Sequence, residues 1–518
     1  MHPGAIARAN PGATAVICGA RRVSYAALDA ASRRLAALAR EHSLARGDVL
    51  AILAGNGPEF LAAAWAAQRS GLYALPIGTR LTAPEVAYIL GDSAAPLLLC
   101  DSERAPLAAA AAAGLGDGAP QTLTLETLPE LYRVAAAPVD VDPVEGGDML
   151  YTSGTTGRPK GVRRPLALAP LGSELARAQR LQALFHMDAG SVFLSPAPLY
   201  HAAPLRFSMA LLRIGGTLVL LPRFDPAAAL AALQTHGVTH SQWVPTMFSR
   251  LLGLDAAQRS ALRAPAHRVA IHAGAPCPAA VKRRMIDWWG PILHEYYSGT
   301  ESVGFTHLDS HEWLRHPGSV GRPRGCEVHI LDDAGQELPP GNVGTVYFSG
   351  RGQPAYHNAP AKTAAALSPQ GYATMGDLGY VDAEGYLYLT DRRAFTIISG
   401  GVNVYPREIE DALHGDSRVA AAAVFGVPDA DLGEAVTAVV QLAPGVPPTL
   451  ATARALRRAL GENLARFKLP RCIAFHPELP LTDSGKLHKA RLREHWRGAV
   501  TALFEQHQLS EDSSCATH

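Results

Sequence analysis

The segment that decides the fold is Tyr151-Thr152-Ser153-Gly154-Thr155-Thr156-Gly157-Arg158-Pro159-Lys160-Gly161. It crowds hydroxyl side chains, glycines and two cations into a few positions. Glycine lets a backbone approach a phosphate closely, and hydroxyl and amide groups donate hydrogen bonds to phosphate oxygens. Lys160 adds a point charge. The segment therefore predicts a phosphate-binding loop, with a plain surface turn as the alternative.

A Walker-type loop is the obvious comparison, and the spacing excludes it. That loop has four residues between its glycines and a Ser or Thr directly after its Lys. Here two residues separate Gly154 from Gly157, and Gly161 follows Lys160. The segment is a phosphate loop of another kind.

Helix and strand signals alternate through the first hundred residues. Residues 49–53 form an apolar run typical of a buried strand, and Pro58 marks the first turn of a helix. Thr82 and Glu85 have the spacing of a capping box, and Gly91 is the expected end of that helix. Such alternation predicts a parallel α/β sheet.

The pattern changes in the last third of the chain. Short alternating segments punctuated by glycine and proline run from about residue 318 to residue 391, as expected for a small antiparallel β unit. Beyond it, Pro406 opens a helix, and apolar residues recur at helical spacing from Leu450. We place a boundary near residues 391–394 and predict two domains, 1–391 and 392–518, the second of them α+β.

Bulk properties narrow the class of protein. The chain has 518 residues, more than one hydrophobic core usually serves, and its net charge is +1, which offers no field for nucleic acid. Six cysteines without a CxxC pair favour a reduced cytoplasmic compartment. Neither a secretory signal nor a run of about 20 apolar residues is visible. Small molecules are the expected partners, without nucleic acid or a membrane-spanning segment, and a homodimer is left open.

Further motifs follow the loop in a specific order, and the similarity covers nearly the whole chain. The chain resembles the adenylate-forming superfamily, which includes acyl-CoA synthetases, firefly luciferase and nonribosomal peptide adenylation domains. The motifs that carry the resemblance, besides residues 151–161, are Pro198-Leu199-Tyr200-His201, Tyr296-Tyr297-Ser298-Gly299-Thr300-Glu301, Gly318-Ser319-Val320-Gly321-Arg322-Pro323, residues 372–377, residues 392–406 and Thr482-Asp483-Ser484-Gly485-Lys486.

The resemblance implies both a fold and an activity. The fold is α/β, with a large N-terminal domain of parallel α/β sheets, a small β-barrel-like unit and a small mobile α+β C-terminal domain. The activity is that of an AMP-forming carboxylate–CoA ligase, with ATP, Mg²⁺ and coenzyme A as cofactor and co-substrates. Three alternatives stay open: transfer of the acyl group to a carrier-protein thiol, transfer to an amine, or a catalytically silent homologue.

The resemblance assigns most motif residues to the nucleotide. Thr300 would donate to the α-phosphate, Tyr297 would stack on adenine, and Asp377 would accept both ribose hydroxyls. Backbone and small side chains would line the adenine edge. The remaining implied nucleotide-binding residues are Thr152, Ser153, Gly154, Thr155, Thr156 and Lys160 in the loop, Gly274, Ala275 and Pro276 at the adenine, and Arg392 at the ribose or phosphates.

The resemblance also implies the catalytic groups. Glu301 is a hard oxygen ligand suited to a Mg²⁺ ion that bridges nucleotide phosphates. Lys486 would bridge the attacking carboxylate and the α-phosphate and stabilise charge in the transition state. His201 and Thr300 complete the predicted catalytic set. No general base is needed, because a carboxylate is already ionised at neutral pH.

Thioester formation is expected to use another arrangement of the C-terminal domain. Members of the superfamily rotate this domain about a hinge and bring a Gly-Gly loop, here Gly400-Gly401, beside the pantetheine channel. The chain departs from the common pattern at the hinge itself, where Ala394-Phe395 replaces a charged pair. No charged side chain can therefore switch partners at that point.

The acid pocket is expected between His201 and Phe305. Small and large apolar residues suggest a roomy pocket for an aliphatic, alicyclic or aryl monoacid. Arg206 is a candidate for a second carboxylate, although a structural arginine is the commoner interpretation. The expected lining residues are Ala202, Ala203, Trp243, Phe248, Ala273 and Gly274.

Overall fold

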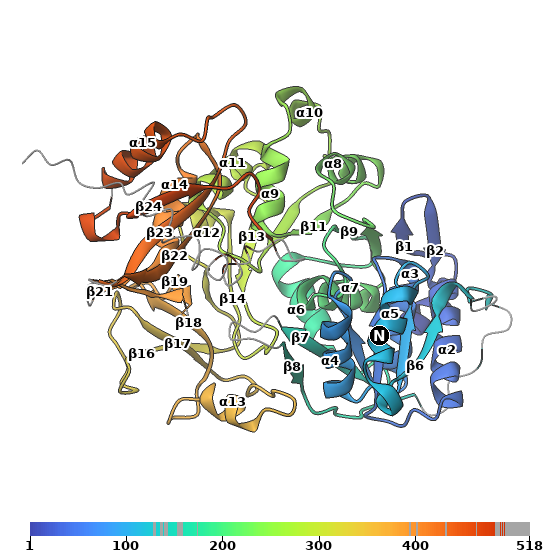
Figure 1. The fold of residues 1–518 in the computed structure, drawn as a ribbon. Helices are drawn as coiled ribbons and strands as arrows, with labels where there is room; N and C mark the ends of the chain where they lie inside the picture. Colours follow the sequence, from blue (N-terminus) through green and yellow to red (C-terminus); the bar gives the residue numbers. More distant parts are fainter. Residues whose placement is uncertain are drawn as a thin grey trace, which may run out of the picture.

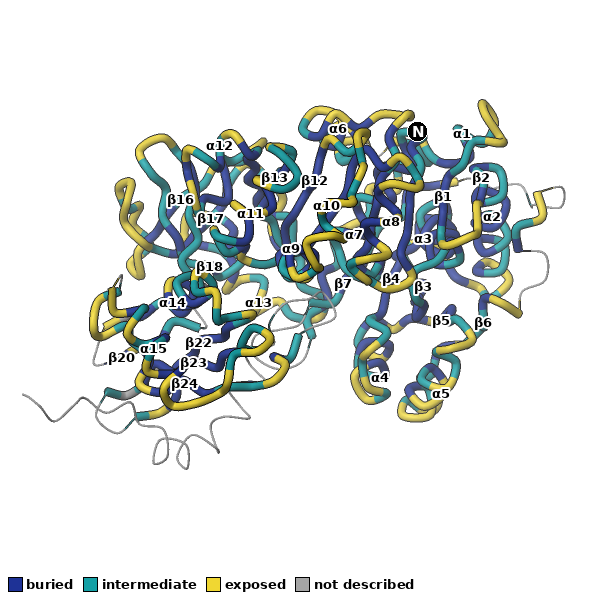
Figure 2. Tube along the Cα trace, turned by 90° about the horizontal axis from the view of Figure 1, so that it is seen from above, coloured by how far each residue is buried: buried dark blue, intermediate teal, exposed yellow. Residues whose placement is uncertain are grey.

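The computed structural model describes residues 1–127, 131–134, 138, 143–152, 159–173, 175–392, 395–399, 402–429, 432–462, 464–481, 487, 489 and 492. Within these ranges the strands form sheets of nine, six, four and five strands. The N-terminal and C-terminal parts of the chain lie at opposite sides of the molecule (Figure 1). Most strand residues are buried, and the exposed residues gather on loops and on the outer faces of helices (Figure 2).

The six-stranded sheet contains the predicted phosphate loop. Its order is β6-β5-β3-β4-β7-β8, parallel except for the antiparallel pair β7–β8. Every residue of β3 is buried, as expected for a parallel strand covered on both faces. The strands are β3 (Val49–Leu53), β4 (Tyr73–Pro76), β5 (Leu97–Cys100), β6 (Gln121–Thr124), β7 (Gly147–Thr152) and β8 (Lys160–Arg163). The accompanying helices are α2 (Tyr25–Glu41), α3 (Pro58–Arg69), α4 (Ala83–Ser93) and α5 (Ala105–Ala113).

The nine-stranded sheet has the order β15-β14-β13-β12-β11-β9-β10-β1-β2, parallel in its centre and antiparallel at both edges. Its strands are β1 (Thr14–Cys18), β2 (Arg21–Ser24), β9 (Val192–Ser195), β10 (Thr217–Leu220), β11 (His240–Trp243), β12 (Val269–His272), β13 (Leu293–Tyr297), β14 (Thr306–Asp309) and β15 (Arg322–Pro323). Its helices are α1 (Pro3–Ala9), α6 (Ala176–Phe185), α7 (Ala202–Ile214), α8 (Pro226–Thr235), α9 (Pro245–Leu252), α10 (Ala256–Ser260), α11 (Ala279–Trp289) and α12 (Ser310–Arg315).

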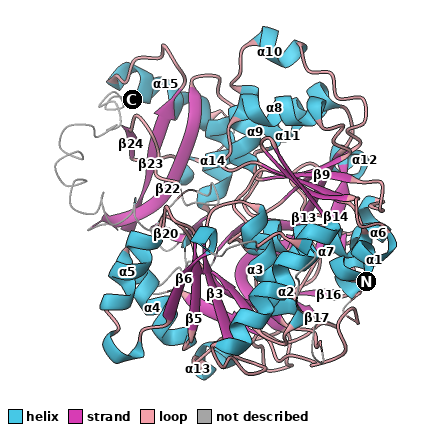
Figure 3. Cartoon of the chain, turned by 90° about the vertical axis from the view of Figure 1, so that its right-hand side faces the viewer, coloured by secondary structure: helices cyan, strands magenta, loops and turns pink. Residues whose placement is uncertain are grey.

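Two smaller sheets complete the fold. The first is antiparallel, in the order β16-β17-β18-β19, and the second has β24 added in parallel to β23 of the path β21-β20-β23-β22. Figure 3 shows strands β22, β23 and β24 of the second sheet away from β3, β5 and β6. The elements are β16 (Glu327–Leu331), β17 (Gly344–Ser349), α13 (Pro360–Ala365), β18 (Ala373–Val381), β19 (Leu387–Arg392), β20 (Ile397–Ser399), β21 (Val402–Val404), α14 (Pro406–His414), β22 (Val419–Asp429), β23 (Gly433–Leu442), α15 (Leu450–Gly461) and β24 (Cys472–Phe475).

Local signals locate most helix starts, and one helix end is corrected. Pro58 opens α3, and Thr82 with Glu85 forms the predicted capping box of α4. Gly91, however, lies inside α4, which continues to Ser93 and ends at Ala94 in the left-handed region with φ +50°. The buried side chains of Leu90 and Ser93 favour this continuation over a glycine stop.

The predicted domain boundary falls between two sheets. The four-stranded sheet ends with β19 at Arg392, and the C-terminal sheet begins with β20 at Ile397. Ala394, the predicted hinge residue, lies outside the described residues. None of the helices in the described ranges combines the length and apolar character needed to cross a bilayer.

Candidate active site

The base of the predicted phosphate loop is a short hairpin. Thr152 at the end of β7 lies opposite Lys160 at the start of β8 in the antiparallel register. Both residues are half-buried. The hairpin thus holds the two ends of the loop together, while Ser153, Gly154, Thr155 and Thr156 lie outside the described residues.

The loop after β13 carries Thr300 and Glu301 and is tightly shaped. A Cβ added at Gly299 would press on the side chains of Met375 and Glu301, so glycine gives both of them room. Ser302 lies in the left-handed region with φ +54°, which costs a residue with a Cβ about 1 kcal/mol. Its backbone N–H donates to the carbonyl of Gly299 at 3.0 Å, which closes the turn. Thr300 and Glu301 are therefore presented on a constrained turn.

Two arginine side chains donate hydrogen bonds to this turn. Arg206 on α7 donates from Nη1 to the carbonyl of Thr300 at 3.0 Å and to Ser302 Oγ at 3.1 Å. Arg164, just after β8, donates to the same Ser302 Oγ at 3.0 Å. The remaining nitrogens of Arg206 bind Asp148 on β7, with Nε and Nη2 each 2.8 Å from a carboxylate oxygen. Arg206 therefore joins the strand before the phosphate loop to the turn after β13.

These contacts decide the role of Arg206. Its side chain is buried and engaged with Asp148, so it is a structural arginine and does not offer a free charge to a second substrate carboxylate. Burial alone would raise the pKa of Asp148, but the neighbouring Arg206 guanidinium holds it well below its usual range. The pair is thus ionised at neutral pH.

The predicted ribose and adenine residues lie side by side. Tyr297 at the end of β13 donates from its hydroxyl to Asp377 Oδ2 at 2.5 Å, across 80 residues of sequence. Asp377 is buried on β18 and lies opposite Arg392 of β19 in the antiparallel register. The backbone of Arg392 is therefore adjacent, while its side chain lies outside the described residues.

The predicted adenine edge begins one strand away. Gly274, Ala275 and Pro276 follow β12, which pairs in parallel with β13, so both segments leave the carboxyl edge of the nine-stranded sheet. Gly274 is exposed and has φ +89°, a conformation that favours glycine. Ligands of open α/β sheets bind at this edge. The position fits a nucleotide base.

Tyr356 is a site residue that the motifs did not reveal. Its hydroxyl donates to Glu301 Oε1 at 2.8 Å, and the ammonium of Lys160 lies 5.4 Å from the centre of its ring. It lies in an irregular stretch between β17 and α13, where no periodicity or glycine pattern marks it. Only its aromatic character could have drawn attention to it.

The donor set at Glu301 fits Mg²⁺. Among the described residues, Oε1 accepts the tyrosine hydrogen bond and none reaches Oε2, which remains available as a hard oxygen ligand. No group of three or more His, Cys, Asp or Glu side chains in the described ranges could hold a metal ion. A single carboxylate is what Mg²⁺ uses when the phosphates and water supply its other ligands.

A stack of aromatic rings lies in the region where the acid pocket is predicted, between His201 and Phe305. Phe305 stacks on Tyr296 with centroids 5.4 Å apart, and Tyr296 stacks on Phe207 of α7 at 5.6 Å. His201 is the N-cap residue of α7, and its ring lies 4.7 Å from that of Tyr200. The small residues Ala202, Ala203 and Ala273 pack in the same hydrophobic cluster as Phe305.

Two predicted lining residues lie elsewhere. Trp243 and Phe248 pack against Trp289 in a separate hydrophobic cluster, with centroids 5.4 and 5.9 Å from that ring. For Trp243 the reason is strand alternation, since neighbouring residues of β11 point to opposite faces, whereas Phe248 lies on α9. Gln242, not Trp243, reaches the aromatic stack, where its Nε2 lies 3.4 Å from the hydroxyl of Tyr296.

The C-terminal catalytic loop is described only at its edges. Leu481 and Leu487 form an antiparallel bridge around residues 482–486, so Lys486 lies outside the described residues, as do Gly400 and Gly401. Lys489 forms an ion pair with Glu410 of α14, with Nζ 2.8 Å from Oε1. The same ammonium lies 5.8 Å from the centre of the Phe395 ring. Lys489 is therefore held against α14 of the C-terminal part.

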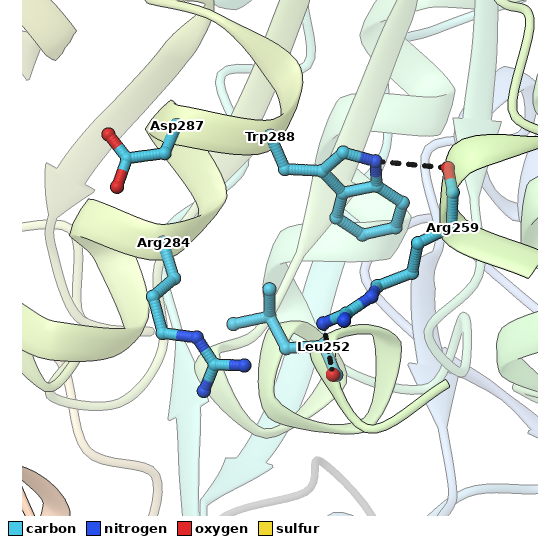
Figure 4. A pocket seen from close by; sticks show the side chains of 5 residues that line it. All are labelled: Leu252, Arg259, Arg284, Asp287 and Trp288. Atoms are coloured by element: carbon cyan, nitrogen blue, oxygen red, sulfur yellow. Dashed lines mark hydrogen bonds between the residues drawn. The ribbon is translucent and has the colours of Figure 1, made fainter. Parts of the chain in front are cut away.

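A surface hollow away from these residues has a volume of about 340 Å³ (Figure 4). It lies between α9, α10 and α11, and the indole of Trp288 donates to the carbonyl of Arg259 within it. None of its lining residues belongs to the motifs. The nucleotide residues, and not this hollow, define the candidate site.

Comparison with known proteins agrees with this site. Residues 5–353 match the AMP-binding enzyme family, and residues 408–486 match the C-terminal domain of AMP-binding enzymes. The chain belongs to this family. The predicted resemblance is therefore confirmed.

Individual members of the family match over almost their whole length. A feruloyl-CoA synthase of an Amycolatopsis species is 33% identical over 506 residues, which cover 95% of this chain and 97% of that protein. A long-chain-fatty-acid–CoA ligase of Mycobacterium tuberculosis is 33% identical over 489 residues, which cover 92% and 94%. The comparisons support the predicted enzyme class, an acyl-CoA synthetase.

Solved structures agree as well. The o-succinylbenzoate-CoA synthetase of Bacillus subtilis, in complex with ATP and a magnesium ion, superimposes with a TM-score of 0.80 at 29% identity, covering 95% of this chain and 98% of that one. An amide bond synthetase of Marinactinospora thermotolerans superimposes with a TM-score of 0.81 at 28% identity, covering 95% and 99%. The predicted α/β fold class is confirmed, and the use of ATP, Mg²⁺ and CoA is supported.

Proposed function

We propose that this family member is an AMP-forming carboxylate–CoA ligase for a hydrophobic monocarboxylic acid. The proposal is supported by two sets of contacts: Lys160 and Glu301 both contact Tyr356, and Tyr297, on the strand that leads to Glu301, donates to Asp377. Tyr296, the neighbour of Tyr297, belongs to the aromatic stack. These groups suit phosphates, a metal ion, a ribose and a hydrophobic acid, respectively.

The first step joins the acid to the nucleotide. A carboxylate oxygen of the acid attacks the α-phosphorus of ATP, the bond to the β-phosphate oxygen breaks, and acyl-AMP and pyrophosphate form. Thr300 donates to the α-phosphate, Lys160 contacts the phosphates, and Lys486 bridges the carboxylate and the α-phosphate. Mg²⁺ on Glu301, when bound, neutralises charge on the leaving pyrophosphate. Positioning and electrostatics carry the step.

The second step exchanges the nucleotide for a thiol. The sulfur of CoA attacks the acyl carbon, AMP leaves, and the thiol proton is released. We propose that residues 392–518 move relative to residues 1–391 between the steps, withdrawing Lys486 and bringing Gly400 and Gly401 to the pantetheine path. The change of sheet between Arg392 and Ile397 supports a hinge at this point.

The acid is proposed to be a hydrophobic monoacid, whether fatty, alicyclic or aryl. Phe305, Tyr296 and Phe207 pack on one another as an apolar wall, and the small residues Ala202 and Ala203 follow His201 in the same hydrophobic cluster. Because Arg206 is engaged with Asp148, it does not select for a second carboxylate. Burial of apolar area therefore favours a hydrophobic monoacid over a dicarboxylate.

Another acceptor is the second candidate, supported by the similarity to an amide bond synthetase. In that case the acyl group passes to an amine or to a carrier-protein thiol. A cytoplasmic location is also proposed, since Cys18, Cys100, Cys277, Cys326 and Cys472 are all free thiols. A homodimer stays a prediction, to be checked by sedimentation.

A panel of acids tests the proposal. AMP release is measured with aryl, alicyclic, fatty, dicarboxylic and amino acids, each with and without CoA and with an amine in place of CoA. The expected result is AMP release that depends on a hydrophobic monoacid and on CoA, with acyl-CoA detected by mass spectrometry. Release that depends on an amine and not on CoA would move the chain to the second candidate.

A further inference from the structure

The stretch around Tyr356 adds an edge to the phosphate-loop hairpin. Tyr356 forms a bridge with Val162 of β8, the carbonyl of Ala355 accepts from Arg163 N at 3.0 Å, and His357 N donates to the carbonyl of Gly161 at 2.7 Å. The stretch therefore lies directly beside the strand that begins at Lys160.

The side chain of Tyr356 contacts two charges of opposite sign. Its hydroxyl donates to Glu301 Oε1 at 2.8 Å, and its ring lies 5.4 Å from the ammonium of Lys160, within the range of a cation–π contact. No ion pair within 4.0 Å joins Lys160 to Glu301 among the described residues. Glu301 and Lys160 thus each contact Tyr356 and do not pair with one another.

The separation of Glu301 and Lys160 matters because each is expected to bind a different group. A direct Lys160–Glu301 pair would occupy the carboxylate that a metal ion needs and the ammonium that a phosphate needs. We propose that Tyr356 is a positioning residue that keeps Glu301 and Lys160 apart and aims them at Mg²⁺ and at the nucleotide phosphates. The proposal rests on the proposed adenylating function.

The stretch is fixed independently of the tyrosine hydroxyl. His357 and Asn358 contact the carbonyl of Asp92 at 2.9 and 3.1 Å, and Tyr356 N donates to Thr363 Oγ1 at 3.2 Å. A Cβ at Gly161 would lie 3.2 Å from the Cβ of His357, so strand and stretch pack closely. Removing the hydroxyl alone should therefore leave the backbone in place.

Tyr356→Phe removes the hydrogen bond and keeps the ring, and Tyr356→Leu removes both contacts. Tyr388→Phe is the matched control, since Tyr388 is also a half-buried tyrosine that donates to a carboxylate, Asp382 Oδ2 at 3.2 Å, away from the site. Mn²⁺ binding in the presence of ATP is measured by electron paramagnetic resonance, alongside the Mg²⁺ dependence of acid-dependent ATP–pyrophosphate exchange. Metal-free ATP binding is measured by calorimetry, and thermal unfolding shows that each variant folds.

The expected result for Tyr356→Phe is a Mn²⁺ affinity and a half-activating Mg²⁺ concentration each weakened about tenfold, the ratio that one hydrogen bond to a charged group supplies. Metal-free ATP affinity should fall only in Tyr356→Leu, about threefold, for the lost cation–π contact. Tyr388→Phe should behave as the parent in each measurement. In a Glu301→Gln background, Tyr356→Phe should add less than about a twofold change, because the hydroxyl then acts on an uncharged group.

Two results would overturn the proposal. One is parental Mn²⁺ affinity in Tyr356→Phe, and the other is the same tenfold change with Glu301→Gln present, which would mean that the hydroxyl does not act through Glu301. Failure of the proposed function looks different, because the parent enzyme would then show no acid-dependent exchange with any acid. The Mn²⁺ measurement would still decide the role of Tyr356 in that case.

Discussion

Arg206 on α7 binds the carboxylate of Asp148 through two parallel hydrogen bonds of 2.8 Å, and its third nitrogen donates to the carbonyl of Thr300 at 3.0 Å. Asp148 lies on β7, four residues before Thr152, and Thr300 lies on the turn that presents Glu301. The planar guanidinium suits this task, because its fork fixes direction as well as distance. One buried side chain thereby couples the strand before the predicted phosphate loop to the turn that presents Glu301.

Replacing Arg206 by lysine should uncouple the two elements. Lysine keeps the charge but cannot make the two parallel hydrogen bonds and the third one together. We expect the KM for ATP to rise about tenfold, for one to two lost charge-assisted hydrogen bonds, together with a lower midpoint of thermal unfolding. Initial rates of ATP–pyrophosphate exchange at varied ATP measure the first effect.

The same helix offers a matched control. Arg213 also makes a buried two-pronged pair, with Glu145 at 3.0 and 2.8 Å, but it touches no residue of the candidate site. Arg213→Lys should lower the unfolding midpoint by a similar amount and leave the KM for ATP unchanged. If Arg206→Lys also left the KM for ATP at the parental value, Arg206 would contribute to stability alone.

The aromatic stack makes a prediction about the acid. Phe305→Ala removes a ring that stacks on Tyr296 at 5.4 Å, so the KM for an aryl acid should rise at least about fivefold, as expected for a lost aromatic contact plus its buried area. Phe248→Ala is the control, since Phe248 is equally buried but lies in the other hydrophobic cluster. It should lower stability and leave the KM for the acid near that of the parent. If the KM for the acid changed in Phe248→Ala and not in Phe305→Ala, the acid would bind beside the hydrophobic cluster of Phe248 and not beside that of Phe305.

Buried histidines make stability depend on pH. Burial lowers the pKa of His240 and His267 to about 4 and that of His307 to about 3, and it lowers those of His272 and His294 as well. Their pKa values in the unfolded chain lie near the model-peptide value of about 6.5, so between pH 6.5 and about 4 the unfolded state binds more protons. The free energy of unfolding should therefore be highest above pH 6.5 and fall as the pH drops, by about 1.4 kcal/mol per pH unit for each full proton of difference.

Guanidinium unfolding followed by tryptophan fluorescence between pH 7.5 and 4.5 measures this slope. His307→Gln should reduce the slope by up to one proton. His311→Gln replaces an exposed histidine on α12 and is the control, with the parental slope expected. A free energy of unfolding that stays constant down to pH 4.5 would show that these histidines are not the acid-sensitive groups.

The sequence predicted local features well where one short pattern determines them. The apolar run of β3 and the capping box of α4 depend on neighbouring residues only, and both form as expected. The end of α4 depends also on burial of Leu90 and Ser93 by distant elements, which overrides the glycine at 91. Boundaries are therefore predicted less well than the elements themselves.

The site residues likewise differ in whether a local pattern or distant packing determines them. Tyr297 and Asp377 are 80 residues apart, and only the family resemblance suggested that both would meet the nucleotide. The partner of Arg206 and the role of Tyr356 arise from tertiary packing, which no motif encodes. Trp243 was predicted to line the pocket but packs in the other hydrophobic cluster, because adjacent residues of a strand point to opposite faces.

The proposed domain movement predicts that the two half-reactions can be separated by mutation. Lys486 lies 326 positions after Lys160 in the numbering and belongs to the proposed C-terminal domain, so it can act only when that domain is docked for adenylation. Lys486→Ala should lower adenylate formation by about 10²-fold or more, for a lost charge contact in the transition state. Thioester formation from a supplied synthetic acyl-AMP should stay largely intact.

A bulky residue at Gly401 should have the opposite effect. A side chain there would obstruct the pantetheine path in the thioester-forming arrangement, while the adenylating arrangement stays available. Gly401→Leu should therefore slow thioester formation and spare adenylate formation, as measured by single-turnover assays of each step. Gly445→Leu serves as the control for a leucine on the same domain, at a position where an added Cβ meets nothing within 4 Å, although its φ of +84° will cost some stability. If Lys486→Ala slowed both steps equally, one arrangement would serve both reactions, and the uncharged hinge at Ala394 would be the next position to substitute, with an aspartate to restore a charge that can change partners.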